Sequence, residues 1–403
     1  MNPDSCTHDV IIAGGGLAGA SLALGLNQLG LNVAVIEAVA RNANHQPSYD
    51  DRTLVLNRAS LRILSHLDAI DDTLQRCPIR RIEVTRAGGF GHVVLNADEH
   101  GVDAFGAVVV ARELGNRLLT AMERADGVTE YCPERLETFD TNDQQVRVRL
   151  TSGQVLSARL LVAADGTQSS IRQTASIAST LHDYRQSAMI FNVQPAQRRP
   201  DVAIERFTPH GPLAFLPQPE GRFGVVWIDR SEGVDVAMQY SDDELIHRLN
   251  RRAGPGFGGF SKPGMRARYP LKLLRTPVPI GQRVVAIGNA ANTLHPVSAQ
   301  GFNLGLRDVA GLIDVLKESN DPGAPTWMAR YVQLRQQDQA DTVRYTNTLA
   351  RVFSNPNPLV QLGAGLGLGA HALLPGLKDR LVRSAMGYRT SIPSLARSDS
   401  IHG

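Results

Sequence analysis

Three glycines near the N-terminus and one later carboxylate have the spacing of a dinucleotide-binding turn. The glycines are Gly14, Gly16 and Gly19 in the segment VIIAGGGLAG, and Glu37 follows about 20 residues further on. In such a turn the first glycine permits a tight bend, the second lets the backbone approach a pyrophosphate, and the third lets a helix pack against the strand. Backbone amides at the helix N-terminus then face the anion, and the acid accepts hydrogen bonds from a ribose. Because an apolar run precedes the turn and apolar residues at helical spacing follow it, we predict a site for a dinucleotide with an unphosphorylated ribose, as in FAD or NAD.

A second motif combines a buried strand with an acidic turn. In the segment LLVAADGTQSSIR, Asp165 and Gly166 directly follow an apolar run. An isolated Asp-Gly pair usually marks only a strand and a polar turn. The full spacing through Ser169 and Arg172 is more specific, and it places a carboxylate and open backbone at the end of a strand. We therefore predict that Asp165 and Gly166 lie beside the same cofactor.

A third segment, GNAANTLHPVSAQGFNLGLRD, has the pattern of a further phosphate-binding turn late in the chain. Gly288 ends a strand-like run, and Asn289 offers a side-chain amide to a phosphate or a ribityl hydroxyl. Gly301, Phe302 and Asn303 begin a helix whose amides can face an anion. Two such turns in one chain are explained if both hold one extended cofactor, FAD. The anion at the second turn is then the N1 and O2 region of the reduced flavin ring, and preorganised dipoles there stabilise its charge.

The candidate catalytic residues lie in the same late segment. They are Gly301, at the beginning of the expected helix, together with His295 and Pro296. A histidine here is a candidate general base. Because a proline follows it directly, the favoured interpretation of His295 is nevertheless structural.

Charge, cysteine and lysine content exclude several functional classes. The net charge is only +3 and no basic block is present, so we expect no nucleic-acid partner. Cys6, Cys77 and Cys132 are too far apart for a redox pair or a cysteine-rich metal site, and we expect no metal and a reducing, cytoplasmic setting. No lysine precedes Lys262, which excludes a Walker-type phosphate loop from the first two thirds of the chain.

The three nucleotide-type segments are separated by a region of different character. Between residues 188 and 268, short strand-like runs alternate with Pro and Gly turns, a pattern typical of an antiparallel sheet. After Pro322 the pattern is helical. We therefore predict an α/β fold (α+β in two domains), in which a Rossmann-like FAD-binding domain is interleaved with an antiparallel β-sheet substrate domain and followed by a helical C-terminal region. The expected boundaries are 1–75, 111–180 and 276–320 for the FAD-binding domain, 76–110 and 181–275 for the β domain, and 321–403 for the helical region.

Together the three motifs resemble those of the class A flavoprotein aromatic hydroxylases, in which a dinucleotide motif, an Asp-Gly motif and a late Gly-Asp motif converge on one FAD. In this chain Asn289 replaces the aspartate of the late motif. That departure, together with the segment ERFTPHGPLAFLPQPEGRFGVVW at 205–227, narrows the resemblance to the ubiquinone-biosynthesis hydroxylases. The resemblance covers nearly the whole chain and implies a fold like that of p-hydroxybenzoate hydroxylase.

This resemblance implies a cofactor set, a substrate class and further site residues. FAD is the bound cofactor, NADPH or NADH is a transient reductant, and O2 is the co-substrate. The substrate is a polyprenyl phenol, 2-polyprenyl-6-methoxyphenol. Arg52 and Arg112 are expected to contact the flavin or its pyrophosphate, with a surface or structural ion pair as the alternative. His210, Phe215 and Trp227 are expected to contact the substrate from the antiparallel sheet, although a role as a turn residue is favoured for His210.

A polyprenyl substrate also implies a membrane nearby. The apolar stretch PLVQLGAGLGLGAHALLPGL at 358–377 has the length of a membrane span, but its glycines, histidine and proline disfavour a spanning helix. It is expected to dock on the bilayer, to line a tunnel for the prenyl tail, or to pack in the core. The expected location is cytoplasmic, with peripheral contact on the inner face of the cytoplasmic membrane. Other enzymes of quinone biosynthesis are the expected partners in a complex.

Several alternatives share the cofactor motifs. The chain could be a flavin monooxygenase acting on another aromatic substrate or ring position, or a flavin-linked polyprenyl reductase. It could also be a non-catalytic FAD-binding scaffold of a quinone-biosynthesis complex. Consumption of O2 separates the hydroxylase from the reductase, and NADPH oxidation that no phenol stimulates would favour the scaffold.

Overall fold

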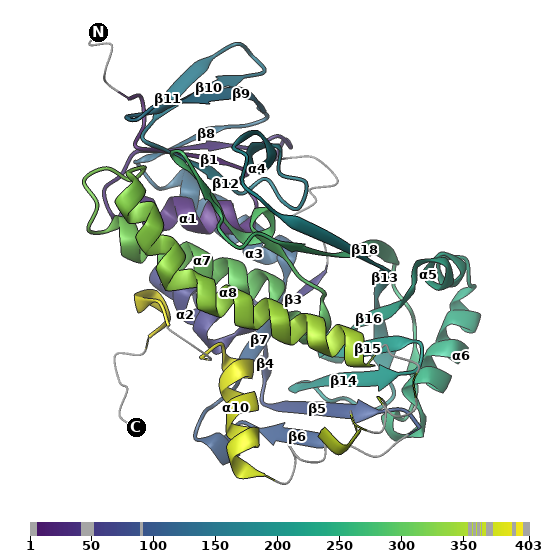
Figure 1. Ribbon diagram of the computed structural model, residues 1–403. Coiled ribbons are helices and arrows are strands. Elements are labelled where there is room, and N and C mark those ends of the chain that lie inside the picture. The colour runs from purple at the N-terminus through teal and green to yellow at the C-terminus, as the bar shows by residue number, and fades with distance from the viewer. Residues whose placement is uncertain are drawn as a thin grey trace.

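The computed structural model describes residues 6–41, 52–88, 92–353, 374–388 and 392–397, together with 357, 360, 363 and 365–367. Two large sheets form the body of the molecule, and the long helix α8 (Pro325–Phe353) runs across both of them (Figure 1). The first sheet lies near the N-terminus in the figure, and the second lies beside the helices α5 (Ser231–Met238) and α6 (Asp242–Ala253).

The first sheet is parallel except at one edge. Its strand order is β19-β20-β12-β1-β2-β8, and only β19 is antiparallel to its neighbour. The central strands are short runs of Val, Ile, Leu and Ala that are buried throughout, as expected for a sheet covered on both faces. The strands are β1 (Val10–Ala13), β2 (Val33–Ile36), β8 (Val128–Tyr131), β12 (Leu160–Ala163), β19 (Ile280–Gly281) and β20 (Val284–Ala286).

Different layers cover the two faces of this sheet. Helices pack on one face and share a large apolar core with it, whereas a three-stranded antiparallel sheet covers the other face. The helices are α1 (Leu17–Gln28), α2 (Arg58–His66), α3 (Ala111–Glu123) and α7 (Gly301–Leu316). The covering strands are β9 (Leu136–Thr141), β10 (Val146–Leu150) and β11 (Val155–Ala158).

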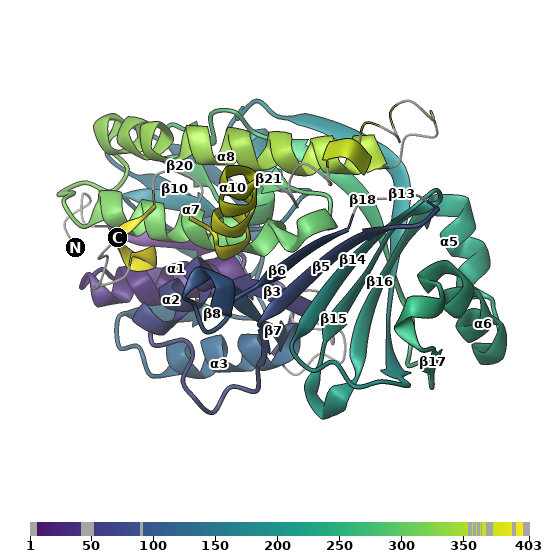
Figure 2. The same ribbon diagram turned by 90° about the horizontal axis from the view of Figure 1, so that it is seen from below.

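The second sheet has the order β21-β18-β13-β16-β15-β14-β5-β6, with β17 paired to the end of β13. Its pairs are antiparallel except for β14 and β5, which are parallel. Figure 2 shows this sheet standing between α7 on one side and the helices α5 and α6 on the other. Its strands are β5 (Arg81–Arg86), β6 (Val93–Asn96), β13 (Thr180–Pro195), β14 (Val202–Thr208), β15 (Gly211–Pro217), β16 (Phe223–Arg230), β17 (Phe260–Ser261), β18 (Ala267–Arg275) and β21 (Asn292–Thr293).

Shorter elements join the two sheets. A three-stranded sheet in the order β3-β7-β4 lies between them, and α4 and α10 complete the regular structure used below. These elements are β3 (Thr53–Asn57), β4 (Cys77–Ile79), β7 (Gly106–Val110), α4 (Ser170–Thr174) and α10 (Pro375–Met386). Two 3-10 turns belong to the late motif, η4 (Gly288–Ala290) and η5 (Val297–Ala299).

The predicted interleaving of the two regions is confirmed. Strands of the first sheet come from 10–36, 128–163 and 280–286, whereas strands of the second come mainly from 81–96 and 180–275. The domain boundaries themselves stay a prediction, since β4 and β7 lie within 76–110 yet pair with β3 rather than with the large sheet. The apolar stretch at 358–377 lies largely outside the described residues. Among the helices that the structure does describe, none combines the length and apolarity needed to cross a bilayer.

A buried cluster of charges joins α7 to α8. Arg335 of α8 is fully buried, and its guanidinium donates to Asp308 of α7 at 3.1 Å and to Asp338 at 2.6 Å. Arg307 of α7 donates to Asp338 at 2.8 Å. Burial by itself would raise the pKa of Asp338, but the two guanidinium groups hold it well below its ordinary value. Each charge therefore depends on partners from the other helix, and the two helices are fixed relative to one another.

Replacing Arg335 with Met should lower the free energy of unfolding by about 3–5 kcal/mol, because two buried carboxylates would lose a partner. The matched control is Arg330→Met on the same helix, whose ion pair with Glu318 is exposed and should contribute about 0–1 kcal/mol. Urea unfolding of both variants measures the difference. Equal losses in the two variants would contradict a structural role for the buried cluster.

Candidate active site

A cavity of about 1330 Å³ lies where the carboxyl ends of the first sheet meet the inner face of the second. Its walls include the residues that follow β1, β2, β12 and β20, as well as side chains from α7, α8 and α10. Ligands of open α/β sheets bind at the carboxyl ends of the strands. Since single-ligand pockets usually measure roughly 300–1,000 Å³, this cavity has room for a substrate beside an extended cofactor.

The glycines of the first motif allow three backbone segments to approach closely. Gly14 has φ +107°, and a Cβ atom there would lie 2.4 Å from the carbonyl oxygen of Ala164. A Cβ atom at Gly19 would lie 1.9 Å from the carbonyl oxygen of Gly14. Gly16 is the N-cap of α1 and lines the cavity with Leu17, so the first amides of the helix stand at the cavity wall. This arrangement fits a pyrophosphate at the N-terminus of α1.

Glu37 is held at the end of β2 by two backbone amides. Its Oε2 accepts from the N–H of Gly15 and its Oε1 from the N–H of Val39, both at 2.8 Å. Each carboxylate oxygen can accept more than one hydrogen bond. Since Glu37 also lines the cavity, its remaining acceptor positions are placed for the hydroxyl groups of a ribose.

The second motif connects the first sheet to the third motif. Asp165 and Gly166 line the cavity, and the Asp165 carboxylate accepts from the N–H of Ser170 at 3.1 Å. Ser169 caps α4, and the Arg172 guanidinium donates to the carbonyl oxygen of Ala290 at 2.7 Å. Burial among protein atoms raises the pKa of the Asp165 carboxyl. This arrangement explains the motif: Asp165 and Gly166 border the cavity, and Arg172 binds η4.

The third motif forms the remaining wall of the cofactor end. Gly288 and Asn289 line the cavity, together with Gly301 and Phe302 at the beginning of α7. Gly288 has φ +55°. A Cβ atom added at Gly305 would lie 3.2 Å from the Cα atom of Gly288, so α7 packs directly on η4. The N-terminus of α7 consequently points at the cavity, as a site for negative charge on a flavin ring requires.

Asn303 also lines the cavity, but its side chain is committed to backbone groups. Its amide donates to the carbonyl oxygens of Val55 and Ala299, both at 2.7 Å. Its Oδ1 accepts from the N–H of Asn57 at 3.0 Å. The residue therefore ties the first turn of α7 to β3, which leaves its backbone as the part that can face a cofactor.

The two predicted flavin-binding arginines occupy different positions. Arg52 borders the cavity, and its guanidinium carbon lies 5.9 Å from the ring centroid of Tyr269. Arg112 is exposed near the beginning of α3 and is not among the residues that line the cavity. Arg52 thus lies at the cavity wall. Arg112 follows Ala111, whose N–H donates to the carbonyl oxygen of Arg52 at 3.0 Å, and its contact with the flavin stays a prediction.

The candidate catalytic residues are likewise divided. Pro296 and Gly301 line the cavity, whereas His295 is fully buried behind its wall. The His295 Nδ1 atom accepts from the N–H of Val297 at 3.2 Å, and its ring packs edge-on against Tyr184. Burial lowers the pKa of His295 to about 4, so the imidazole is neutral near pH 7. This geometry supports the structural interpretation of His295.

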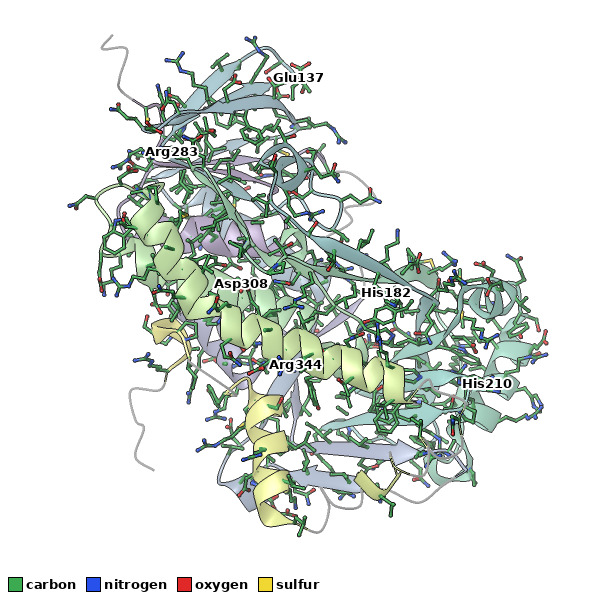
Figure 3. The ribbon with its side chains drawn as sticks, in the orientation of Figure 1. Glu137, His182, His210, Arg283, Asp308 and Arg344 are labelled. Carbon is green, nitrogen blue, oxygen red and sulfur yellow. The ribbon has the colours of Figure 1, made fainter. Side chains whose placement is uncertain are left out.

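The predicted substrate residues face away from the cavity. Phe215 stacks on Phe260 in the core beneath α6, and Trp227 is covered by the guanidinium of Arg252 at 4.7 Å from the ring centroid. His210 is exposed in the turn between β14 and β15, and Figure 3 shows it far from Asp308 and the α7–α8 interface. None of these three side chains lines the cavity.

Their neighbours at alternate positions take the cavity face. Successive side chains of a strand point to opposite faces, so the residues beside Phe215 and Trp227 point inward. The alternation of apolar residues along each strand could have identified both faces, but it does not say which face meets the cofactor. The inward residues that the sequence interpretation missed are Glu205, Phe207, Ala214, Leu216, Val226 and Ile228.

The part of the cavity away from the glycine turn is apolar. It is bordered by strands β5 and β6 on one side and by helices α8 and α10 on the other. The lining side chains here are Ile82, Val84, Leu95, Leu349, Val352, Leu381 and Ala385. The cavity thus has a polar end built by the three motifs and an apolar end built by the large sheet and the late helices.

Comparison with known proteins identifies the family. Residues 7–346 match the family model described as FAD binding domain. Ubiquinone hydroxylase UbiL of Rhodospirillum rubrum is 34% identical over 388 residues, covering 94% of this chain and 89% of the relative. The 3-demethoxyubiquinol 3-hydroxylase of Escherichia coli is 32% identical over 389 residues, covering 94% of this chain and 98% of the relative.

Solved structures of flavoprotein monooxygenases share the fold. The crystal structure of pqsL, a probable FAD-dependent monooxygenase from Pseudomonas aeruginosa, has a TM-score of 0.75 at 23% identity and covers 89% of this chain and 99% of that chain. The p-nitrophenol 4-monooxygenase PnpA from Pseudomonas putida DLL-E4 has a TM-score of 0.75 at 17% identity, with coverages of 94% and 98%. These similarities confirm the predicted fold class.

Replacing Glu37 with Gln should weaken FAD binding by about 10–100-fold. The carboxylate now accepts hydrogen bonds from two backbone N–H groups, and the amide N–H₂ of Gln cannot accept one of them. The loss of one charge-assisted hydrogen bond costs roughly 1.5–3 kcal/mol. Titration of the FAD-free protein with FAD, followed by flavin fluorescence, measures the change. Glu137→Gln is the control, because Glu137 is exposed on β9 (Figure 3) and is not among the residues that line the cavity. Equal affinities in both variants would remove Glu37 from the cofactor site.

Proposed function

Because the chain belongs to the family of FAD-binding flavoprotein monooxygenases that includes the ubiquinone hydroxylases, we propose that it inserts one oxygen atom from O2 into the ring of a polyprenyl phenol during ubiquinone biosynthesis. FAD is its cofactor, and NAD(P)H and O2 are the co-substrates of this class of enzyme. The proposed substrate is 2-polyprenyl-6-methoxyphenol, since the segment 205–227 and the late motif most resemble those of 2-octaprenyl-6-methoxyphenol hydroxylase. A neighbouring ring position is the alternative, as the Escherichia coli relative is a 3-demethoxyubiquinol 3-hydroxylase.

One observation carries the proposal: a single cavity joins the cofactor motifs to an apolar chamber. An enzyme that oxidised only a small polar substrate would have no use for the apolar side chains between β5, β6, α8 and α10. A prenyl tail would bury them, and each methylene group removed from water contributes about 0.8 kcal/mol. Tail and ring are therefore assigned to different ends of the same cavity.

The residues of the chain would hold the cofactor at three points. The N-terminus of α1 would bind the pyrophosphate and Glu37 the ribose, while Asp165 and Asn289 would border the rest of the dinucleotide. Bound FAD supplies two-electron chemistry with NAD(P)H and the activation of O2. The amides at Gly301 and Phe302 would stabilise negative charge on the flavin ring, because the N-terminus of α7 is directed at that position.

The large sheet would orient the phenol and keep water away from it. Its inward side chains are mostly apolar, and α8 lines the cavity with Leu349, Val352 and Phe353. Exclusion of water strengthens electrostatic interactions and limits loss of the reactive oxygen to solvent. The ring is consequently proposed to lie between the beginning of α7 and the strands β14, β15 and β16.

Because a prenylated substrate resides in a membrane, we also propose that the protein contacts the membrane surface peripherally. Helix α10 contributes Leu381 and Ala385 to the apolar end of the cavity, so a tail leaving in that direction would pass this helix. Association with other enzymes of quinone biosynthesis belongs to the same proposal. A flavin-linked reductase or a non-catalytic scaffold would use the same cofactor motifs, and neither would transfer oxygen from O2 to the ring.

Deleting the gene should cause a 2-polyprenyl-6-methoxyphenol to accumulate and should deplete ubiquinone, and restoring the gene should reverse both changes. Mass spectrometry of the extracted lipids measures them. Restoration with Gly19→Val is the control, because its added Cβ atom would meet the carbonyl oxygen of Gly14 at 1.9 Å and should prevent FAD binding. An unchanged quinone pool, with no phenol accumulated in a strain lacking other hydroxylases, would contradict the proposed substrate.

A further inference from the structure

One inward side chain of the large sheet is out of place in an apolar wall. Glu205 lies in the middle of β14, and its register partners are Val84 of β5 and Ala214 of β15. Both partners line the cavity, as does Glu205 itself. The other inward positions nearby are Ile82, Ala203, Phe207 and Leu216 on these strands and Val226 on the neighbouring β16. Glu205 is thus a carboxyl group surrounded by apolar side chains in this part of the cavity wall.

Nothing in the described part of the chain compensates this carboxyl. No hydrogen bond or ion pair to it is found there, and the guanidinium of the adjacent Arg206 lies on the opposite face, where it binds Thr85 and the carbonyl oxygen of Arg252. Burial is the sole cause that raises the pKa of Glu205 to about 8. Glu205 is partly buried at the cavity wall. A carboxyl without a partner in an apolar wall is costly, and an apolar residue would avoid that cost. A polar ligand atom would explain why the position carries an acid.

Other titratable groups around the cavity do not account for the raised pKa of Glu205. Tyr345 of α8 and Arg52, which precedes β3, line the cavity from outside the large sheet, whereas Tyr269 lines it from β18 of the same sheet. Arg86 lies beyond Val84 on β5. None of them contributes to the shift in the pKa of Glu205. Burial therefore remains the cause of the raised pKa of Glu205.

Glu205 is also close to the expected position of the reacting ring. Phe207 lies two residues further along β14, about 7 Å away at the usual rise of a strand. The Phe207 ring stacks on Phe353 of α8 and packs in the same cluster as Val297 of η5, the turn that leads into α7. Val84, the register partner of Glu205, packs against the same cluster and belongs to the apolar end of the cavity. The carboxyl therefore lies at the border between that apolar end and the region beside the beginning of α7, where the proposed function places the phenol.

We infer that Glu205 binds the hydroxyl group of the phenol and acts as the general base that removes its proton. This inference rests on the proposed function, since it requires a phenolic ring. The phenol O–H bond breaks, its proton forms a new O–H bond on the carboxylate, and the electron pair stays on the phenol oxygen. The resulting phenolate is richer in electrons at the ring carbons next to and opposite that oxygen, which favours attack by an electrophilic oxygen. The proton returns to the product oxygen before release, so Glu205 ends as it began.

The apolar setting suits this task. A phenol has a pKa of about 10 and an ordinary glutamate about 4.3, so transfer between them is unfavourable by roughly a million-fold. With the pKa of the Glu205 carboxyl near 8, the same transfer is unfavourable by only about a hundred-fold. A base is most effective when its pKa lies near the working pH, and burial provides that shift here.

The test is the pH dependence of hydroxylation by the FAD-loaded enzyme with 2-geranyl-6-methoxyphenol, NADPH and O2. Product measured by mass spectrometry should rise about tenfold per pH unit below pH 8 and level off above it, because the carboxylate is the active form. Glu205→Gln should retain FAD but lose activity by about 100-fold or more at pH 8, and its residual rate should no longer rise through this range. Glu205→Asp should keep a rising limb.

Glu83→Gln is the matched control, since it makes the same change on the neighbouring strand β5 but on the opposite face. There Glu83 binds Arg81 at 2.7 Å and Arg199 at 2.5 Å, and its loss should leave the pH profile of hydroxylation unchanged. If Glu205→Gln keeps the wild-type rate and pH profile, the inference is overturned and the proposed function stands. If the wild type forms no hydroxylated phenol, the proposed function fails and the inference with it. If the variants lose FAD, a wild-type rate that is flat from pH 6 to 9 overturns the inference.

Discussion

The site depends on a close approach of backbone that leaves no room for side chains. The turn after β1 lies against the turn after β12, as the 2.4 Å approach of a Cβ atom at Gly14 to Ala164 shows. The turn after β12 is in turn bound to η4 through Arg172, and η4 packs under α7 at Gly305. Three segments separated by more than a hundred residues each are thereby held at one edge of the sheet. A cofactor lying along that edge can contact all three at once.

A second constraint fixes the side of the cavity that faces the substrate. The buried charges between α7 and α8 hold the two helices together, so the helix that points its N-terminus at the cofactor is coupled to the helix that lines the apolar chamber. Loss of one member would leave a buried charge without its partner, so the cluster favours a single arrangement of the two helices. Polar and apolar ends of the cavity can then be built independently, the first from turns and helix termini and the second from strand faces.

The sequence predicted the site residues well where the backbone must approach closely, as in the glycine turns. It predicted them less well where the site residues depend on which face of a strand borders the cavity. Gly14, Gly19 and the Asp165 turn follow spacings set by close packing, and the structure brings them together. Phe215 and Trp227 were assigned to the substrate, but their strands present Ala214 and Val226 to the cavity instead. A shift of one residue along a strand exchanges its faces, and only the position of the cofactor domain decides which face is functional.

The central claim is that this chain transfers oxygen from O2 to a phenol ring. The most direct test supplies the FAD-loaded protein with NADPH, 2-geranyl-6-methoxyphenol and ¹⁸O₂ in unlabelled water, and analyses the product by mass spectrometry. We expect a product with one additional oxygen atom, which carries the ¹⁸O label, formed in proportion to the NADPH consumed. NADPH oxidation that yields only hydrogen peroxide, or a product whose new oxygen comes from water, would contradict it.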